Sequence, residues 1–223
     1  MRNVILFDMD GTLLDTLEDL YHSTNAALTQ YGFPTRTMEE VRRFVGNGAR
    51  NLMRRAVPGG EENEHFEDCI QAFKVHYGVH LNDHTGPYPG ILTLLRTLSE
   101  RGYAMGVVSN KPDFAVKDLA ERMFADLLGV AIGESDQIRR KPAPDTVKQA
   151  AKALGVSLEE CIYVGDSEVD IETAKNCGIP CVSVSWGFRE RKLLEDLGAV
   201  WIADDTKELL EILTREERWT NEK

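Results

Sequence analysis

Two aspartates one residue apart, Asp8 and Asp10, follow a short apolar run near the start of the chain. An apolar run at residues 4–7 with a charged end is typical of a buried strand whose carboxyl end meets solvent. Side chains alternate along a strand, so both carboxylates would point the same way. They would repel each other unless a cation lay between them or one carried a proton. Ligands of open α/β sheets bind at this end of the strands, so the pair predicts metal-assisted chemistry there.

Polar residues recur where three later strand–loop–helix units are expected to turn, at Ser109-Asn110, Lys141, Asp166 and Asp170. Each alone has an ordinary explanation: a helix cap, a solvated lysine, or acidic residues favoured by a helix dipole. Together they lie at the carboxyl ends of parallel strands, which share one edge of a sheet, so they can converge. The set holds an anion cradle, one cation and several carboxylates. Carboxylate oxygens without a Cys or His cluster favour a hard ion, and Mg²⁺ fits best.

The elements that must position these residues alternate strictly from residue 87 onward. Helical periodicity is expected at 91–100, 113–123, 144–154, 169–176, 190–196 and 206–213, and strands at 103–108, 130–132, 162–164, 181–184 and 200–202. This order predicts an α/β fold, a Rossmann-like parallel sheet core with helices on both faces.

Residues 15–86 carry helical patterns and no evident strand. We therefore expect an all-helical cap domain at 15–86, inserted into an α/β hydrolase core formed by 1–14 and 87–223. An insertion directly after the proposed catalytic strand is well placed to close over the site.

Composition excludes several classes of function. The 223 residues include 26 Lys and Arg against 37 Asp and Glu, a net charge of −11, and no basic stripe that would suit nucleic acid. No apolar stretch approaches the length of a membrane span, and no signal peptide is evident, so a cytoplasmic protein is expected. The four cysteines lack metal-ligand or redox spacing. All five histidines fall within residues 15–86, and we expect no catalytic role for them.

The motifs match a known family. The chain resembles the haloacid dehalogenase-like hydrolase superfamily, in particular phosphatases with an inserted helical cap. The first motif is Asp8-Met9-Asp10-Gly11-Thr12-Leu13, the second Ser109-Asn110, the third Lys141-Pro142, and the fourth Gly165-Asp166-Ser167 with Asp170.

The resemblance implies a role for each motif. Asp8 would be the nucleophile that forms an aspartyl-phosphate, and Asp10 would protonate the leaving group and then activate water. Mg²⁺ would be held by Asp8, the backbone carbonyl of Asp10 and Asp166, with Asp170 in support. Ser109, the Asn110 backbone and Lys141 would hold the phosphoryl oxygens. A carboxylic acid at position 10 suits oxygen leaving groups, unlike dehalogenase or phosphonate chemistry.

Substrate choice would come from the cap. The segment Phe44–Ala56 resembles the cap of phosphoglycolate phosphatases, and its candidate substrate-facing residues are Asn47, Gly48 and Arg50. Arg50 or Arg54 would pair the carboxylate of 2-phosphoglycolate, or else lie on a solvated helix face.

Three alternatives stay open. Related helical-cap members dephosphorylate sugar phosphates, nucleotides or pyrophosphate. β-Phosphoglucomutase-type isomerases share the four motifs and return the phosphoryl group to a sugar. A non-enzymatic phospho-acceptor is disfavoured by the insertion and by Asp10. The expected partner is a small phosphorylated metabolite, without nucleic acid or membrane, and the expected state is a monomer or homodimer.

Overall fold

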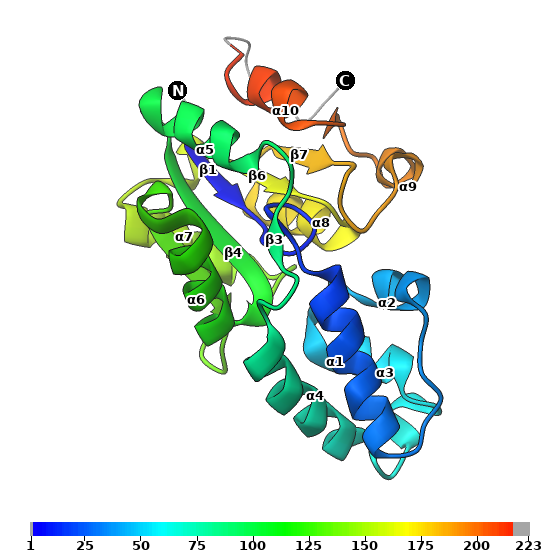
Figure 1. Cartoon of the computed structure of the whole chain (residues 1–223). Helices are drawn as coiled ribbons and strands as arrows, with labels where there is room; N and C mark the ends of the chain where they lie inside the picture. Colours follow the sequence, from blue (N-terminus) through cyan, green and yellow to red (C-terminus); the bar gives the residue numbers. More distant parts are fainter. Residues whose placement is uncertain (1, 216–223) are drawn as a thin grey trace. The chain divides into compact units, whose positions relative to one another are not determined.

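The computed structural model describes residues 2–215, and their contacts divide the chain into two units (Figure 1). The core unit comprises the described residues up to Leu14 and from Pro87 onward. The helical unit comprises Asp15–Gly86. The chain thus leaves the core unit directly after the first strand and re-enters it about seventy residues later.

Six parallel strands form the sheet of the core unit, in the order β5-β4-β1-β6-β7-β8. The strands are β1 (Val4–Phe7), β4 (Ala104–Pro112), β5 (Val130–Glu134), β6 (Cys161–Gly165), β7 (Cys181–Val184) and β8 (Trp201–Ala203). This sheet confirms the predicted α/β class. Because β1 lies between β4 and β6, the residues after β1 are flanked on both sides by other strand ends.

Helices alternate with the strands of the core unit from residue 91 onward. They are α5 (Ile91–Glu100), α6 (Asp113–Phe124), α7 (Asp145–Leu154), α8 (Glu168–Cys177), α9 (Arg191–Asp196) and α10 (Thr206–Leu213), with short 3₁₀ turns η2 (Ala125–Leu127) and η3 (Leu158–Glu160). Val4 and Leu6 of β1 pack with α7 and α8 residues in one core cluster. Ile5 and Phe7 point to the opposite face and are also fully buried. Both faces are therefore covered, as the apolar strands require.

Four helices and one 3₁₀ turn make the helical unit: α1 (Leu17–Gln30), α2 (Met38–Phe44), α3 (Gly48–Ala56), η1 (Gly60–Glu62) and α4 (Phe66–His80). The apolar stripe of α4 includes Phe66, Phe73 and Tyr77, all buried, and α1 packs against this helix. At the start of α2, Thr37 and Glu40 form a capping box: each side chain accepts the other residue's backbone N–H.

The structure differs from the sequence expectation in several places, of which three bear on the site or the helical unit. The expected strand at 103–108 continues to Pro112, with a register shift between Val108 and Pro112, because the polar residues there stay buried beside β5. The sequence from residue 61 to 80 has a helical pattern throughout, but α4 starts only at Phe66, after η1. Two short strands that were not expected, β2 (Leu14–Asp15) and β3 (Gly86–Pro87), pair in a second sheet. No helix among residues 2–215 is long and apolar enough to cross a membrane.

Candidate active site

The core-unit candidates gather at the carboxyl edge of the sheet. Asp8 directly follows β1, and its backbone N–H donates to Val164 O of β6 at 2.8 Å, so strand pairing fixes its position. Ser109 and Asn110 lie in β4, and Asp166 directly follows β6. The side chains of all four residues are buried despite their polarity. Burial of this kind is costly unless the groups are paired, so their partners decide what the site can do.

Lys141 is the positive centre of the site. Its Nζ lies 2.8 Å from Asp8 Oδ1, 2.8 Å from Asp170 Oδ1 and 2.9 Å from the Tyr163 hydroxyl. Although burial lowers the pKa of this ammonium, the charges of Asp170 and Asp8 raise it above its ordinary value. Lys141 is therefore held charged beside the proposed nucleophile, where it can also face an anionic substrate.

The Asn110 side chain fixes the backbone at Lys141. Its Nδ2 donates to Lys141 O at 3.0 Å, and Lys141 N donates to Asn110 Oδ1 at 2.8 Å. These two bonds join β4 to the loop after β5. The Asn110 side chain is thus a positioning group for Lys141, and the phosphoryl contact predicted for Asn110 is that of its backbone.

Both oxygens of Asp170 are already engaged within the protein. Oδ1 accepts from Lys141 and from the Tyr163 hydroxyl at 3.1 Å. Oδ2 accepts the Ser167 N–H at 3.1 Å and its hydroxyl at 2.6 Å, as in a capping box at the start of α8. Asp170 acts on the site through Lys141 and Ser167, and its service as a metal ligand stays a prediction.

The neighbourhood of Asp166 is closed by glycines. A Cβ on Gly11, whose φ is 81°, would collide with the Asp166 carboxylate. A Cβ on Gly187 would collide with the backbone oxygen of Gly11 and with the Asp166 side chain. Phe188 N donates to Asp166 Oδ2 at 2.7 Å. Only glycine fits this close approach of backbone to carboxylate, which explains the Gly after the Asp8–Asp10 pair.

The carboxylates fit a divalent metal. Asp8, Asp166 and Asp170 are all buried, and each offers an oxygen within 4.8 Å of the others. Burial raises the pKa of Asp8 to about 7, and the charges of Asp170 and Asp10 add to this against the opposing charge of Lys141. Burial, with the charges of Asp170 and Asp8, likewise raises the pKa of Asp166 well above its ordinary value. An all-oxygen set that carries excess negative charge matches the preference of Mg²⁺.

Sequence reasoning missed one direct partner of the aspartate pair. Lys111 Nζ lies 2.9 Å from Asp10 Oδ1, and the Lys111 side chain is almost fully buried. Strand alternation was the available signal, because residues 109 and 111 share a face only if β4 continues past Val108. The bidentate ion pair of Arg189 with Glu168, at 2.8 and 3.1 Å, was also not anticipated.

The cap candidates belong to the other unit. Asn47 precedes α3, and Gly48 begins it with a φ of 76°. Arg50 pairs with Glu61 at 3.3 Å and with Glu67 at 2.7 Å, and its guanidinium lies over the Phe66 ring. Arg54 donates to Asn51 Oδ1 at 3.2 Å. Substrate contact by any of these residues remains a prediction.

The sequence of this chain is similar to those of known hydrolases over most of its length. A profile of the haloacid dehalogenase-like hydrolases matches residues 5–184. A phosphoglycolate phosphatase of Pseudomonas putida is 32% identical over 215 residues, covering 94% of this chain and 79% of the relative. Phosphoglycolate phosphatase 1 of Pseudomonas aeruginosa is 30% identical with the same coverage.

Solved structures are similar over almost the whole chain. A putative phosphoglycolate phosphatase from Lactobacillus delbrueckii superimposes with a TM-score of 0.91 at 36% identity, covering 95% of this chain and 98% of the other. A predicted phosphoglycolate phosphatase from Haemophilus somnus gives 0.86 at 30% identity, covering 95% and 98%.

Proposed function

Because the chain belongs to the haloacid dehalogenase-like hydrolases and is a phosphoric monoester hydrolase among them, we propose that it hydrolyses 2-phosphoglycolate with Mg²⁺ through an aspartyl-phosphate. One observation carries the chemical part: Asp8 lies at the tip of β1, 2.8 Å from the ammonium of Lys141 and beside Asp166. A carboxylate nucleophile, a fixed cation and an oxygen-ligand set are thus joined in one buried cluster.

Phosphoryl transfer requires a nucleophile that can approach an anionic phosphorus. In our proposal the Asp8 carboxylate forms a bond to phosphorus while the ester P–O bond breaks. Lys141, Ser109 and the Asn110 backbone N–H face the phosphoryl oxygens and stabilise their charge. Bound Mg²⁺, with Asp8, Asp166 and the Asp10 backbone carbonyl as ligands, would neutralise charge that otherwise repels the carboxylate.

Asp10 handles the protons in both halves of the reaction. It donates a proton to the leaving alkoxide, and its carboxylate then takes a proton from the water that attacks the aspartyl-phosphate. The products are an alcohol and inorganic phosphate, and Asp8 is regenerated. The ion pair with Lys111 holds the Asp10 side chain in place between these steps.

The substrate assignment rests on the similarity to relatives that carry this name and on the arginines of α3. A phosphate-release screen over a panel of metabolites tests it. We expect a higher kcat/KM for 2-phosphoglycolate than for glycolytic sugar phosphates, nucleotides or pyrophosphate, each assayed with Mg²⁺. Preference for another member of the panel would contradict the substrate and leave the chemical mechanism standing.

The same screen includes an isomerase arm. β-Glucose 1-phosphate is incubated with a bisphosphate activator, and glucose 6-phosphate and free phosphate are both measured. Glucose 6-phosphate formed without phosphate release would overturn the hydrolase assignment in favour of a mutase.

A further inference from the structure

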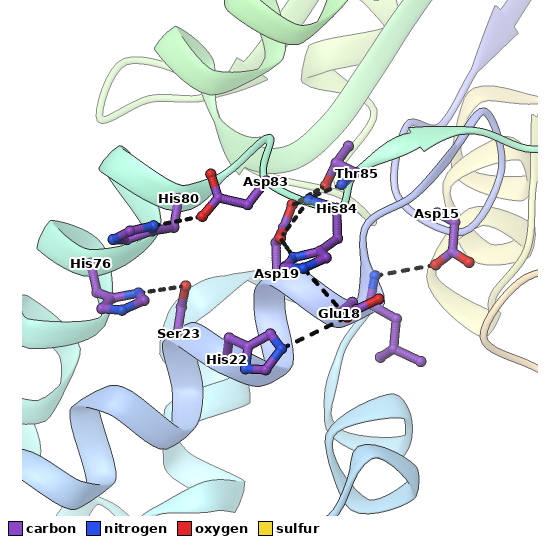
Figure 2. A network of polar contacts seen from close by, with 11 residues as sticks. Asp15, Glu18, Asp19, His22, Ser23, His76, His80, Asp83, His84 and Thr85 are labelled. Atoms are coloured by element: carbon purple, nitrogen blue, oxygen red, sulfur yellow. Dashed lines mark hydrogen bonds and ion pairs between the residues drawn. The ribbon is translucent and has the colours of Figure 1, made fainter.

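The helical unit carries a second cluster of potential metal ligands, made of residues other than the aspartates of the core unit. Figure 2 shows Glu18 and His22, one turn apart on α1, together with His84 from the segment that follows α4. Glu18 Oε1 lies 3.5 Å from His84 Nε2 and 3.8 Å from His22 Nε2. The three ligand atoms all lie within 4.8 Å of one another. We propose that Glu18, His22 and His84 bind a transition-metal ion of the Zn²⁺ class.

The spacing suits tetrahedral coordination. With metal–ligand distances of about 2.0–2.1 Å, the ligand atoms of a tetrahedral zinc ion stand about 3.4 Å apart. The two measured separations from Glu18 are within a few tenths of an ångström of that value. Two imidazoles and one carboxylate form a ligand set that zinc uses where its fourth position holds water. The three side chains are exposed, so solvent can supply that fourth ligand.

A buried carboxylate orients one of the imidazoles. His84 Nδ1 lies 2.9 Å from Asp19 Oδ1, and Asp19 is only 1% exposed. Asp19 also accepts the His84 N–H, the Thr85 N–H at 2.9 Å and the Thr85 hydroxyl at 2.7 Å, so its position is fixed (Figure 2). When Nδ1–H donates to Asp19, the Nε2 lone pair is directed at Glu18. This carboxylate–histidine arrangement is the usual support of a metal-bound imidazole.

His76 and His80, also on the helical unit, do not converge with other potential metal ligands in this way. His80 pairs with Asp83 at 2.7 Å, and His76 contacts the Ser23 hydroxyl at 3.0 Å. The two rings stack on each other at 4.3 Å. Among the described residues, neither belongs to a group of three metal-ligating side chains. His80 is therefore a matched control: an exposed histidine beside a carboxylate on the same unit.

Ligand chemistry separates the proposed site from the aspartate cluster. The core cluster offers oxygen atoms alone, which suits Mg²⁺, whereas two of three ligands here are imidazole nitrogens, which suit zinc or cobalt. A bound ion would join the first turns of α1 to the segment before β3. These segments carry the two ends of the helical unit, so binding should stabilise that unit against unfolding.

The test compares metal binding by the full-length protein and its variants in excess Mg²⁺, which keeps the oxygen site supplied. Zn²⁺ is titrated by calorimetry, and Co²⁺ by its visible absorption. We expect His22→Ala, a change at a half-exposed side chain, to lose one zinc equivalent or bind it at least about tenfold more weakly. The tetrahedral cobalt spectrum should disappear with it, while His80→Ala should match the parent protein in both readouts.

Asp19→Asn tests separately whether Asp19 orients the His84 imidazole for metal binding. We expect it to weaken zinc binding by about 10- to 100-fold while leaving all three direct ligands in place. If that variant fails to fold, the comparison of His22→Ala with His80→Ala decides alone. Equal zinc stoichiometry and affinity in the parent and His22→Ala, or no binding to the parent protein, would overturn the proposal. In that case His84 is only an ion-pair partner of Glu18 and Asp19.

Discussion

Each of the two units carries a cluster of potential metal ligands, but the cluster of the core unit is buried and that of the helical unit is exposed. In the core unit, the side chains of Asp8 and Asp166 are largely removed from solvent, and Lys141 supplies a buried cation beside Asp8. On the helical unit, Glu18, His22 and His84 are exposed, so water can solvate them when no ion is bound. A buried charge is strongly destabilising unless an opposite charge compensates it, whereas water stabilises an exposed charge. Substitutions in the core cluster should therefore lower the free energy of unfolding far more than substitutions in the exposed cluster of the helical unit.

The largest expected effect follows from replacing the proposed nucleophile. Asp8→Asn should lower kcat at least about a thousandfold, since the amide that replaces the carboxylate is a poor nucleophile and Asp10 is assigned to proton transfer. Phosphate release from 2-phosphoglycolate, with thermal unfolding as a check on folding, measures this. Asp118→Asn, at an exposed α6 residue paired with Arg122, is the matched control and should keep full activity. Activity of Asp8→Asn near the parent level would refute the mechanism.

Asp10 should matter in a way that depends on the leaving group. Asp10→Asn should lower kcat on an alkyl phosphate by about 10²–10⁴-fold, because the alkoxide needs a proton. With p-nitrophenyl phosphate, whose leaving group is stable without a proton, we expect a burst of nitrophenolate followed by slow turnover. Rapid-mixing absorbance measures the burst. An equal loss on both substrates without a burst would remove the acid role from Asp10.

The buried cation should dominate the stability of the core cluster. Lys141→Met leaves the carboxylates of Asp8 and Asp170 without their cation, which should lower the free energy of unfolding by about 3–5 kcal/mol. Denaturant titration without Mg²⁺ measures the change. Lys148→Met on exposed α7 surface should have little effect. Equal unfolding midpoints for the two variants would show that the Lys141 ammonium is not needed to compensate the charges of Asp8 and Asp170.

Protons and Mg²⁺ should compete in the core cluster. Since the pKa of Asp8 is raised to about 7, this carboxyl is mostly ionised at pH 8 and mostly protonated at pH 6. Mg²⁺ must then displace a proton at the lower pH, so its apparent affinity should fall about tenfold over this interval. Calorimetric Mg²⁺ titrations at both pH values measure the change. An affinity that is constant across this range would contradict the assignment of Asp8 as a ligand.

The smallest expected effect lies on α3. Arg50→Ala should raise the KM for 2-phosphoglycolate several-fold, roughly up to tenfold, because a substrate carboxylate loses its partner. The KM for p-nitrophenyl phosphate, which has no carboxylate, should stay unchanged. Arg54→Ala is the matched variant, and an effect confined to it would transfer the role to Arg54. If both variants behave like the parent protein, neither arginine meets the substrate carboxylate.

The sheet was predictable because its physical signals are local. Apolar runs that end in polar residues, followed by helical periodicity, fix a parallel sheet and the edge at which Asp8 and Asp166 meet. The extension of β4 to Pro112 was not predictable, because the strand continues through polar residues that only tertiary pairing keeps buried. Lys111 was overlooked for the same reason.

The division of labour among polar groups was harder to foresee. Sequence spacing brings Asp170 to the site but does not show that Lys141, Tyr163 and Ser167 occupy both of its oxygens. The grouping of His84 with His22 was equally hidden, since the two residues are far apart in the chain. Only the packing of the segment after α4 beside α1 brings them together.

The two hydrogen bonds between the Asn110 side chain and the main chain of Lys141 have a consequence for loop design. They hold the backbone at the end of the loop, so the position of the lysine does not depend on the path of the preceding residues. Asp136 and Gln137 in this loop are exposed, so changes there should leave the ammonium in place, whereas Ile138 packs against the core cluster and should be kept. The exposed pair Asp136 and Gln137 is therefore a suitable place to insert a reporter or a new binding segment into an otherwise intact enzyme.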